Sequence, residues 1–151
     1  MFTEWTYKQV KTRIAREQRV NLSILGITCM RNDCAYAPEW IAHHLAVGFD
    51  RILVLSHDNS DGTDAVLDRL ADDARVAHVS FEPKGKKSVQ WQALKLADDH
   101  PWLKDADWAM FFDCDEFLCL PEGGAVADLT ALKGGAFDAL ALPWRLYGSG
   151  G

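Results

Sequence analysis

The sequence predicts an α/β fold, with an open, mainly parallel sheet and helices on both of its faces. Short apolar runs of strand length alternate with longer segments of helix length along most of the chain, which is the pattern of successive βα units. Residues 108–112 are apolar throughout and aromatic at three of five positions. Such a run is typical of a strand covered on both faces. We therefore predict that 108–112 forms a central strand.

Composition limits the classes of partner. The length of 151 residues suits one domain, and an apolar fraction of 48% is ordinary for a globular protein. The formal net charge of −6 argues against a nucleic-acid-binding surface and favours small-molecule partners. No apolar run approaches transmembrane length, and the chain starts with polar residues rather than a secretory signal. We therefore expect no transmembrane segment and a cytoplasmic protein.

The cysteines lack Cys-x-x-Cys spacing and lie at positions 29, 34, 114 and 119. Reduced thiols are the expected state in a cytosolic protein. A zinc site built from the two Cys-x4-Cys pairs is the alternative interpretation.

Residues 1–20 are predicted to form a lead-in helix that precedes the domain at 21–151. Basic side chains are scattered here among apolar ones, as on a short amphipathic helix. A solvated basic face is the favoured interpretation, and peripheral contact with an anionic membrane surface is the alternative.

Three strand–helix pairs are expected before the central strand. In the second pair, the polar loop contains Ser60 and Asp61, either of which can cap the free N–H groups of the following helix. The predicted strands are 21–30, 51–56 and 75–81, and the predicted helices are 38–47, 64–71 and 88–99, with Pro101 helping to end the last helix.

The helix at 38–47 has Pro38 in its first turn and Gly48 just past its end, which are typical boundary residues. His43 and His44 are neighbours on this helix, so their side chains diverge and cannot easily share one metal ion. We expect packing and surface hydrogen bonds for both.

After the central strand, a small helix is predicted near 125–132 and a last strand at 137–144. Pro143 cannot donate to a ladder, which places this last strand near an edge. The chain then ends in a glycine-rich loop, and we expect the domain to be incomplete at its C-terminal end.

Three acids, Asp113, Asp115 and Glu116, follow the central strand, at the end of the strand where open α/β sheets bind ligands. On extended backbone Asp113 and Asp115 would point to the same side. At ~4 Å and a dielectric of ~20 their repulsion is on the order of 4 kcal/mol, which calls for a proton, a basic side chain or a metal. Oxygen ligands favour Mg²⁺ or Mn²⁺. A solvated acidic turn is the alternative.

Two other loops carry candidate binding residues. Asp58 precedes the helix cap at the end of a strand, where its carboxylate can accept hydrogen bonds from a nucleobase or a ribose; plain turn chemistry is the alternative. Lys84 and Lys86 lie in a loop with three lysines, on the side where the strands end. They are candidate ligands for a diphosphate, and a solvated charged loop is the alternative.

The order of these segments resembles the glycosyltransferase family 2-like proteins of GT-A fold, in particular the branch with an Asp-x-Asp-Glu-Phe motif. The resemblance covers roughly residues 22–151, nearly the whole chain. The segments that carry it are 28–32, Glu39-Trp40, Asp58-Asn59-Ser60-Asp61-Gly62-Thr63, Gln90-Trp91-Gln92, Phe112-Asp113-Cys114-Asp115-Glu116-Phe117 and Trp144-Arg145-Leu146-Tyr147-Gly148.

The resemblance implies a metal-dependent transferase that moves a sugar from a nucleoside-diphosphate donor to a glycan, lipid or protein acceptor, with inversion. Asp58 would contact the base, and Thr28 and Asn32 would line the same pocket. Asp113 would lie by the ribose and the metal, and Asp115 would coordinate the metal. The catalytic base would come from farther along the chain, at a position that this sequence does not identify.

Two other classes of function compete with this interpretation. Phosphatases of the haloacid-dehalogenase type also carry an aspartyl nucleophile in an Asp-x-Asp motif after an apolar strand. Their motif follows the first strand, whereas here it follows the fourth. A nucleotide-sugar-binding module without catalysis, or a fragment of a transferase, is the third interpretation.

Overall fold

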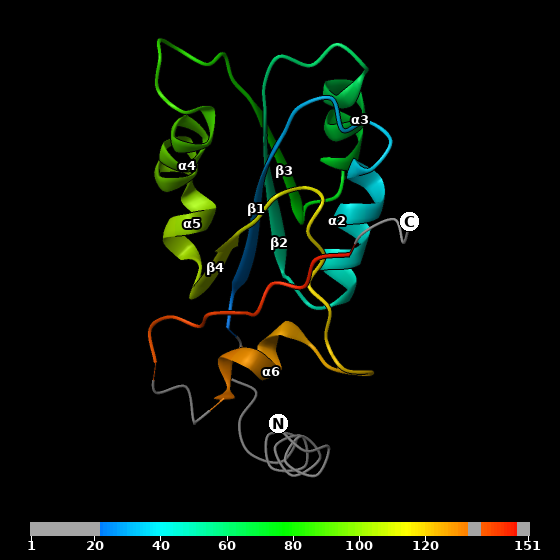
Figure 1. The fold of residues 1–151 in the computed structure, drawn as a ribbon, viewed down its shortest axis with the longest axis vertical. Helices are drawn as coiled ribbons and strands as arrows, with labels where there is room; N and C mark the ends of the chain where they lie inside the picture. Colours follow the sequence, from blue (N-terminus) through cyan, green and yellow to red (C-terminus); the bar gives the residue numbers. More distant parts are fainter. Residues whose placement is uncertain (1–21, 133–136, 148–151) are drawn as a thin grey trace.

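The fold is built on a four-stranded parallel sheet in the order β3-β2-β1-β4 (Figure 1). The computed structural model describes residues 22–132 and 137–147. The lead-in helix predicted at 1–20 lies outside these residues. The strands are β1 (Ile24–Met30), β2 (Arg51–Ser56), β3 (Val76–Ser80) and β4 (Trp108–Phe111). The predicted α/β class with an open parallel sheet is confirmed.

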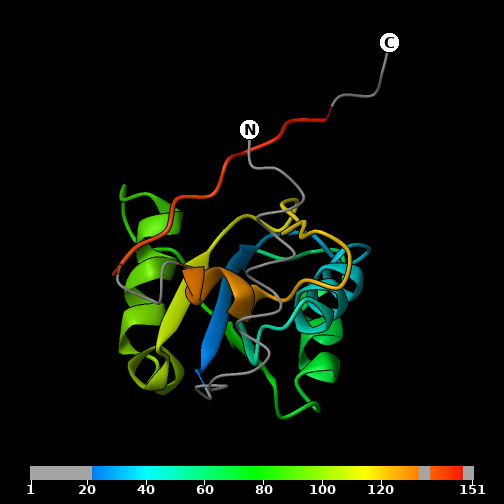
Figure 2. The same cartoon turned by 90° about the horizontal axis from the view of Figure 1, so that it is seen from below.

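Helices cover both faces of the sheet, and Figure 2 shows the three layers from below. Helices α2 (Ala37–Ala46) and α3 (Thr63–Leu70) lie on one face, and α4 (Val89–Asp99) and α5 (Pro101–Asp105) lie on the other. A short helix, α6 (Val126–Thr130), lies beyond the end at which β1 begins. The predicted helices at 38–47, 64–71, 88–99 and 125–132 correspond to α2, α3, α4 and α6.

Helix α5 is a finding that the sequence analysis missed. Pro101 was expected to help end the preceding helix, and the backbone does leave the helical region at His100, with φ −74° and ψ 136°. A residue before proline avoids the helical region, which explains the break. The same proline suits a first helical turn, and the His100 ring accepts a hydrogen bond from the Trp102 N–H. The chain therefore starts a second helix at once.

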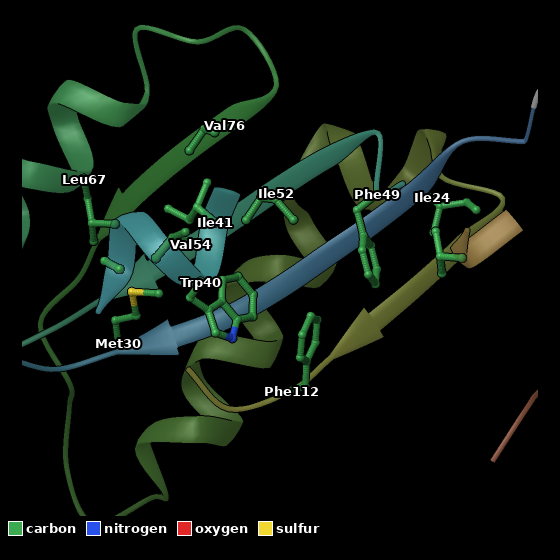
Figure 3. Packing of buried hydrophobic residues seen from close by; sticks show 12 residues of the cluster. Ile24, Met30, Trp40, Ile41, Phe49, Ile52, Val54, Leu67, Val76 and Phe112 are labelled. Carbon is green, nitrogen blue, oxygen red and sulfur yellow. The ribbon is translucent and has the colours of Figure 1, made fainter. Parts of the chain in front are cut away.

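The core has two parts because side chains alternate across the strands. One cluster joins residues of the sheet to Trp40 and Ile41 of α2 and Leu67 of α3 (Figure 3). The other joins the opposite face to Ala93 and Ala97 of α4. Strand β2 contributes to both, and its residues 52–55 are at most 1% exposed. This strand and β1 are the buried centre of the sheet.

Strand β4 does not have the predicted central position. It pairs with β1 and has no second partner among the described residues. Trp108, Met110 and Phe111 are half-buried, and Ala109 is exposed. The aromatic run that suggested a two-sided interior strand has another cause: Phe112, just beyond the strand, packs on Trp40 of α2, with ring centroids 4.8 Å apart (Figure 3).

The predicted last strand at 137–144 is also wrong. Residues 137–147 form neither helix nor strand, and most of their side chains are exposed, including Trp144 at 75%. Alternating apolar residues favour a strand only where a partner strand is present to accept its hydrogen bonds, and this segment pairs with none of the described strands.

Within the described part of the chain, no helix has the length and apolar character needed to cross a membrane.

Candidate functional site

The candidate site is formed by loops at the carboxyl ends of the parallel strands, the upper end of the sheet in Figure 1. The loop after β1 is bonded to the loop after β2: the Asn32 amide oxygen accepts from the Ser60 N–H at 2.8 Å, and the Asn32 N–H donates to Asn59 Oδ1 at 2.8 Å. The Cys34 N–H donates to the Asp61 carboxylate at 3.0 Å. These bonds hold the two loops as one unit.

Asn32 and Asp58 are the two described non-glycine residues with positive φ, at 59° and 47°. Asparagine and aspartate tolerate this left-handed region better than most residues. Asp58 keeps its side chain 56% exposed, and its carboxylate lies 3.1 Å from His57 Nδ1. The geometry therefore presents the Asp58 carboxylate to solvent beside the bonded loops, while the side chain of Asn32 is used to join them.

The N-cap residue of α3 is Gly62, which makes no side-chain cap bond; of the two expected residues, Asp61, just before it, bonds a free N–H of the helix. Its Oδ1 accepts from the N–H and the hydroxyl of Thr63, the first residue of α3. The bond from the Thr63 hydroxyl is the main cause that lowers the pKa of Asp61. Ser60 is instead bonded to Asn32. Loop structure thus accounts for Asp61 and Ser60 but not for the exposed carboxylate of Asp58.

Thr28, which the resemblance placed in the nucleotide pocket, lies in the middle of β1 and is 0% exposed. Its hydroxyl is buried without a hydrogen-bond partner in the described structure. A buried hydroxyl without a partner is unfavourable. Thr28 therefore lies beneath the site rather than on its surface.

The acids after β4 form a turn, here called the acid turn, from Asp113 to Glu116. The strand ends at Phe111, the Glu116 N–H donates to the Asp113 carbonyl at 3.1 Å, and the Glu116 carboxylate accepts from the Asp113 N–H at 3.1 Å. The expectation of extended backbone through Asp115 is wrong, because this reciprocal pair of bonds closes the chain into a turn. Asp113 and Asp115 are both exposed.

Helix α2 holds the acid turn and Leu118, which follows it, through three side chains. The Trp40 indole N–H donates to the Glu116 carbonyl at 2.8 Å, and His43 Nε2 lies 3.0 Å from the Leu118 carbonyl. His44 Nε2 accepts from the Leu118 N–H at 3.3 Å. We call these three residues the α2 clamp. The expected packing and hydrogen bonding are present for both histidines, but His44 is fully buried, so its bonds are not the surface bonds that were expected. The sequence did not predict that the chain after β4 would be the partner of these side chains. The i, i+3, i+4 spacing of Trp40, His43 and His44 does place all three on one side of the helix.

His44 is a neutral, buried member of this clamp. Its side chain is 0% exposed, and Nδ1 lies 2.8 Å from the Trp40 carbonyl. With Nδ1–H donating to that carbonyl, Nε2 is free to accept from the Leu118 N–H. Burial lowers the pKa of His44 to about 4, against a smaller opposing effect of the Trp40 carbonyl. The arrangement therefore uses the uncharged imidazole.

The acid turn also contacts the loop after β1 and helix α4. The Cys114 thiol lies by the Asp33 carboxylate; burial and this neighbour raise the pKa of Cys114 to about 12. Burial, with Asp113 and Asp33, raises the pKa of Cys29 to about 11. On the other side, the Gln90 amide donates to Asp113 at 3.3 Å. The site is thus continuous from Asp58 through Asn32 and Asp33 to Asp113.

A pocket of about 390 Å³ opens beside the acid turn. The first turn of α4 forms one wall and the end of β4 forms the other. Its lining residues are Gln90, Trp91, Leu94, Phe111, Phe112, Asp113 and Glu116. In the sequence, Gln90 and Trp91 carried only the resemblance, and Leu94 was only part of the predicted helix at 88–99.

Lys84 and Lys86 are exposed, in the loop between β3 and α4. This loop is fixed to α4 by the Gln92 side chain, which accepts from the Lys84 N–H at 2.7 Å and donates to the Lys87 carbonyl. Neither lysine lines the pocket. The structure therefore places both at the correct end of the sheet but not in contact with the acids.

A Ser-His-Asp arrangement beneath the loop after β2 is structural. Ser56 Oγ lies 2.8 Å from His78 Nε2, and His78 Nδ1 lies 2.7 Å from the Asp68 carboxylate. Ser56 is 0% exposed, however, and its hydroxyl donates to Asp64 at 2.6 Å. A nucleophile must reach its substrate and must be activated by the base. Here the serine does neither, so the network holds α3 against the sheet.

The donor set of the acid turn suits a hard divalent cation. Asp113 and Asp115 are exposed, and neither is paired with a basic side chain in residues 22–132 and 137–147. The same residues contain no group of three or more His, Cys, Asp or Glu that could hold a metal ion, which gives no support to a zinc site built from the cysteines or to a site formed by the three acids of the acid turn alone. Magnesium needs only one or two protein carboxylates when substrate phosphates and water complete its shell.

Comparisons with known proteins point to one family. A family profile described as glycosyltransferase family 92 matches residues 31–135. A glycosyltransferase family 92 protein of Ricinus communis is 27% identical over 110 residues, which cover 70% of this chain and 18% of that protein. A glycosyltransferase family 92 protein of Oryza sativa subsp. japonica is 26% identical over 111 residues, which cover 71% of this chain and 18% of that protein. The chain therefore spans about a fifth of the length of these relatives.

The expected relation to glycosyltransferases is confirmed by this match, whereas the expected assignment to family 2 and its Asp-x-Asp-Glu-Phe branch is not. The matched region contains the loops after β1 and β2, the first turn of α4, the acid turn and the α2 clamp. It therefore includes the whole site described above. The chain belongs to glycosyltransferase family 92.

Proposed function

We propose that this chain carries the donor-binding half of a glycosyltransferase that uses a nucleoside-diphosphate sugar and a divalent cation. The observation that carries the proposal is the continuous edge of polar loops at the carboxyl ends of β1, β2 and β4. It presents Asp58 at one end and Asp113 with Asp115 at the other. Open α/β sheets bind nucleotides at this position, and the family match supports a sugar-transferring activity.

Each residue has a distinct role in the proposal. Asp58 accepts hydrogen bonds from the base, with the Asn32 bonds keeping its loop in place. Asp113 faces the ribose and, with Asp115, holds Mg²⁺ or Mn²⁺, which supplies Lewis-acid stabilisation of the leaving diphosphate. Lys84 and Lys86 contribute positive charge toward the diphosphate. Thr28 supports the pocket from beneath.

Transfer with inversion requires a base that deprotonates the acceptor hydroxyl on the side opposite the leaving group. Asp113 and Asp115 are assigned to the cation, so the base belongs to another part of the protein. The acceptor in this proposal is a glycan, a lipid or a protein.

A thermal-shift titration of the chain with Mn²⁺ plus UDP or GDP tests the proposal. At a ligand concentration 100-fold above Kd, binding increases the free energy of unfolding by about 2.7 kcal/mol. This increase raises the Tm of a domain of this size by several degrees. The gain should require Mn²⁺ and should disappear in Asp115→Asn. Asp98→Asn is the matched control, because Asp98 is also exposed and lies at the far end of α4.

The same titration separates the competing functions. A shift with simple phosphate esters, with covalent labelling of Asp113 by a phosphoryl analogue, would favour a haloacid-dehalogenase-type phosphatase over the transferase. Nucleotide binding without turnover in a longer form of the protein would favour the binding module. A metal-dependent shift that Asp115→Asn retains would remove the acid turn from the metal site.

A further inference from the structure

The pocket beside the acid turn has a chemistry that differs from that of a phosphate site, and the inference drawn from it rests on the function proposed above. Its only ionisable lining residues are Asp113 and Glu116, both acids, in a pocket of the described structure lined by no basic side chain. Like charges at short range are unfavourable. The pocket therefore repels phosphate and carboxylate groups and suits an uncharged or cationic ligand.

Trp91 gives the pocket an exposed aromatic surface. It lines the pocket although its side chain is 71% exposed, which makes it one of the most exposed large apolar residues of the described chain. Exposure of so large an apolar ring at a hollow is typical of a binding surface. Leu94 and Phe111 continue the apolar surface next to it.

Polar groups line the same pocket, with Gln90 next to Trp91 on α4 and with Asp113 and Glu116 on the acid turn. The Gln90 amide, with one N–H on Asp113 at 3.3 Å, can use its carbonyl and its other N–H toward a ligand. The carboxylates of Asp113 and Glu116 accept hydrogen bonds. An apolar ring together with an amide and two acceptors in one pocket matches a pyranose, whose C–H face packs on an aromatic ring while its hydroxyls donate to carboxylates.

We propose that this pocket binds an uncharged pyranose ring, stacked on Trp91 and bonded through its hydroxyls to Gln90, Asp113 and Glu116. The ring belongs either to the donor sugar or to a glycan acceptor. Contact of Asp113 with both the pocket and the cation site puts this ring next to the diphosphate.

The experiment compares the chain with its Trp91→Ala variant in two titrations. The first uses Mn²⁺ with UDP and GDP, and with their glucose, galactose, mannose and N-acetylglucosamine derivatives. The second uses methyl glycosides of the same sugars, followed by saturation-transfer NMR. Trp144→Ala is the matched control, because Trp144 is 75% exposed and does not line the pocket.

Trp91→Ala should weaken binding of at least one nucleotide sugar by about fivefold, the scale of one aromatic contact, and leave the free nucleoside diphosphate unchanged. Such a result assigns the pocket to the donor sugar. If Trp91→Ala loses only the methyl-glycoside signal, the pocket is assigned to an acceptor. This assignment does not require nucleotide binding. Failure of every nucleotide to bind would reject only the proposed function. Equal binding of every sugar ligand by the wild-type chain and by Trp91→Ala, or an equal effect of Trp144→Ala, overturns the inference.

Discussion

His44 shows how one buried side chain can make the acid turn sensitive to pH. The neutral ring joins the Trp40 carbonyl to the Leu118 N–H, and burial lowers its pKa to about 4. In the unfolded chain a histidine titrates near 6.5. Between these two values the unfolded state binds more protons than the folded state, so the stabilisation is complete above about pH 6.5 and falls as the pH decreases toward 4.

The first prediction follows from this sign. His44 alone should make the free energy of unfolding about 2 kcal/mol lower at pH 5 than at pH 7, because each unit of pKa difference corresponds to about 1.4 kcal/mol. Urea denaturation at both pH values measures the difference. His44→Gln cannot titrate, so its stability should change much less over this range; an identical pH dependence in both proteins would contradict the role of His44.

Thr28 gives a second prediction at the same scale. Its buried hydroxyl has no partner among the residues that the structure describes, so Thr28→Val should stabilise the fold by about 1 kcal/mol by removing an unsatisfied polar group. Chemical denaturation measures this gain. Nucleotide binding by the same variant is the informative second readout: an unchanged Kd places Thr28 outside the ligand contacts, and a loss of stability would show that the hydroxyl has a partner after all.

At the scale of elements, α2 acts on the acid turn through its clamp. Trp40 is fully buried, packs on Phe112 with the two rings tilted by 40°, and donates to the Glu116 carbonyl. The neighbouring ring contacts extend this packing to His44 and Phe117. A helix of the core thus determines where a surface turn stands, which explains how an exposed pair of carboxylates can keep a defined position.

Trp40→Phe tests this coupling, because phenylalanine keeps an aromatic ring against Phe112 but cannot donate to Glu116. The loss of this hydrogen bond should cost about 1–2 kcal/mol, and the Leu118 amide should exchange hydrogen faster. Trp102→Phe, on the opposite face of the sheet, is the control and should leave Leu118 unchanged. Slow exchange at Leu118 in Trp40→Phe would mean that the two histidines hold the turn alone.

The elements from β1 to α4 could be predicted from sequence because each carries its own signal. Strand β2 is apolar from Ile52 to Leu55, and α2 is bounded by Pro38 and Gly48. The edge position of β4 could not be predicted. An apolar run indicates that its side chains contact apolar neighbours, but it does not indicate which elements supply those neighbours. Phe112 obtains that contact from Trp40 and Phe49 rather than from a second neighbouring strand.

The candidate site was predictable in its types of residue and less so in its geometry. Asp58, Asp113 and Asp115 were found because acids at strand ends are a local pattern. The turn at Asp113–Glu116 depends on Glu116 bonding back to the Asp113 N–H, and the clamp depends on residues more than 70 positions apart. Such bonds have no signature within a short window of sequence.

At the scale of the whole molecule, the outer edge of β4 has unpaired backbone groups in the described structure. Such an edge is a template for another strand. The 151-residue chain should therefore associate with itself as its concentration rises, and Ala109→Lys, in the middle of β4, should reduce this association. Light scattering over a concentration series measures it. Ala65→Lys adds the same charge at an exposed position of α3 and should have a smaller effect; equal effects would point to net charge alone.

The bonds that join the loop after β1 to both of its neighbours have a thermodynamic consequence. Asn32 is tied to Ser60 on one side, and Asp33 lies by Cys114 on the other, so the segments that carry Asp58 and Asp115 share one rigid connection. A nucleotide that steadies the first segment would then increase the affinity of the second for its cation, and the cation would increase the affinity for the nucleotide by the same factor. The nucleotide donor and the cation would therefore bind this site with positive cooperativity.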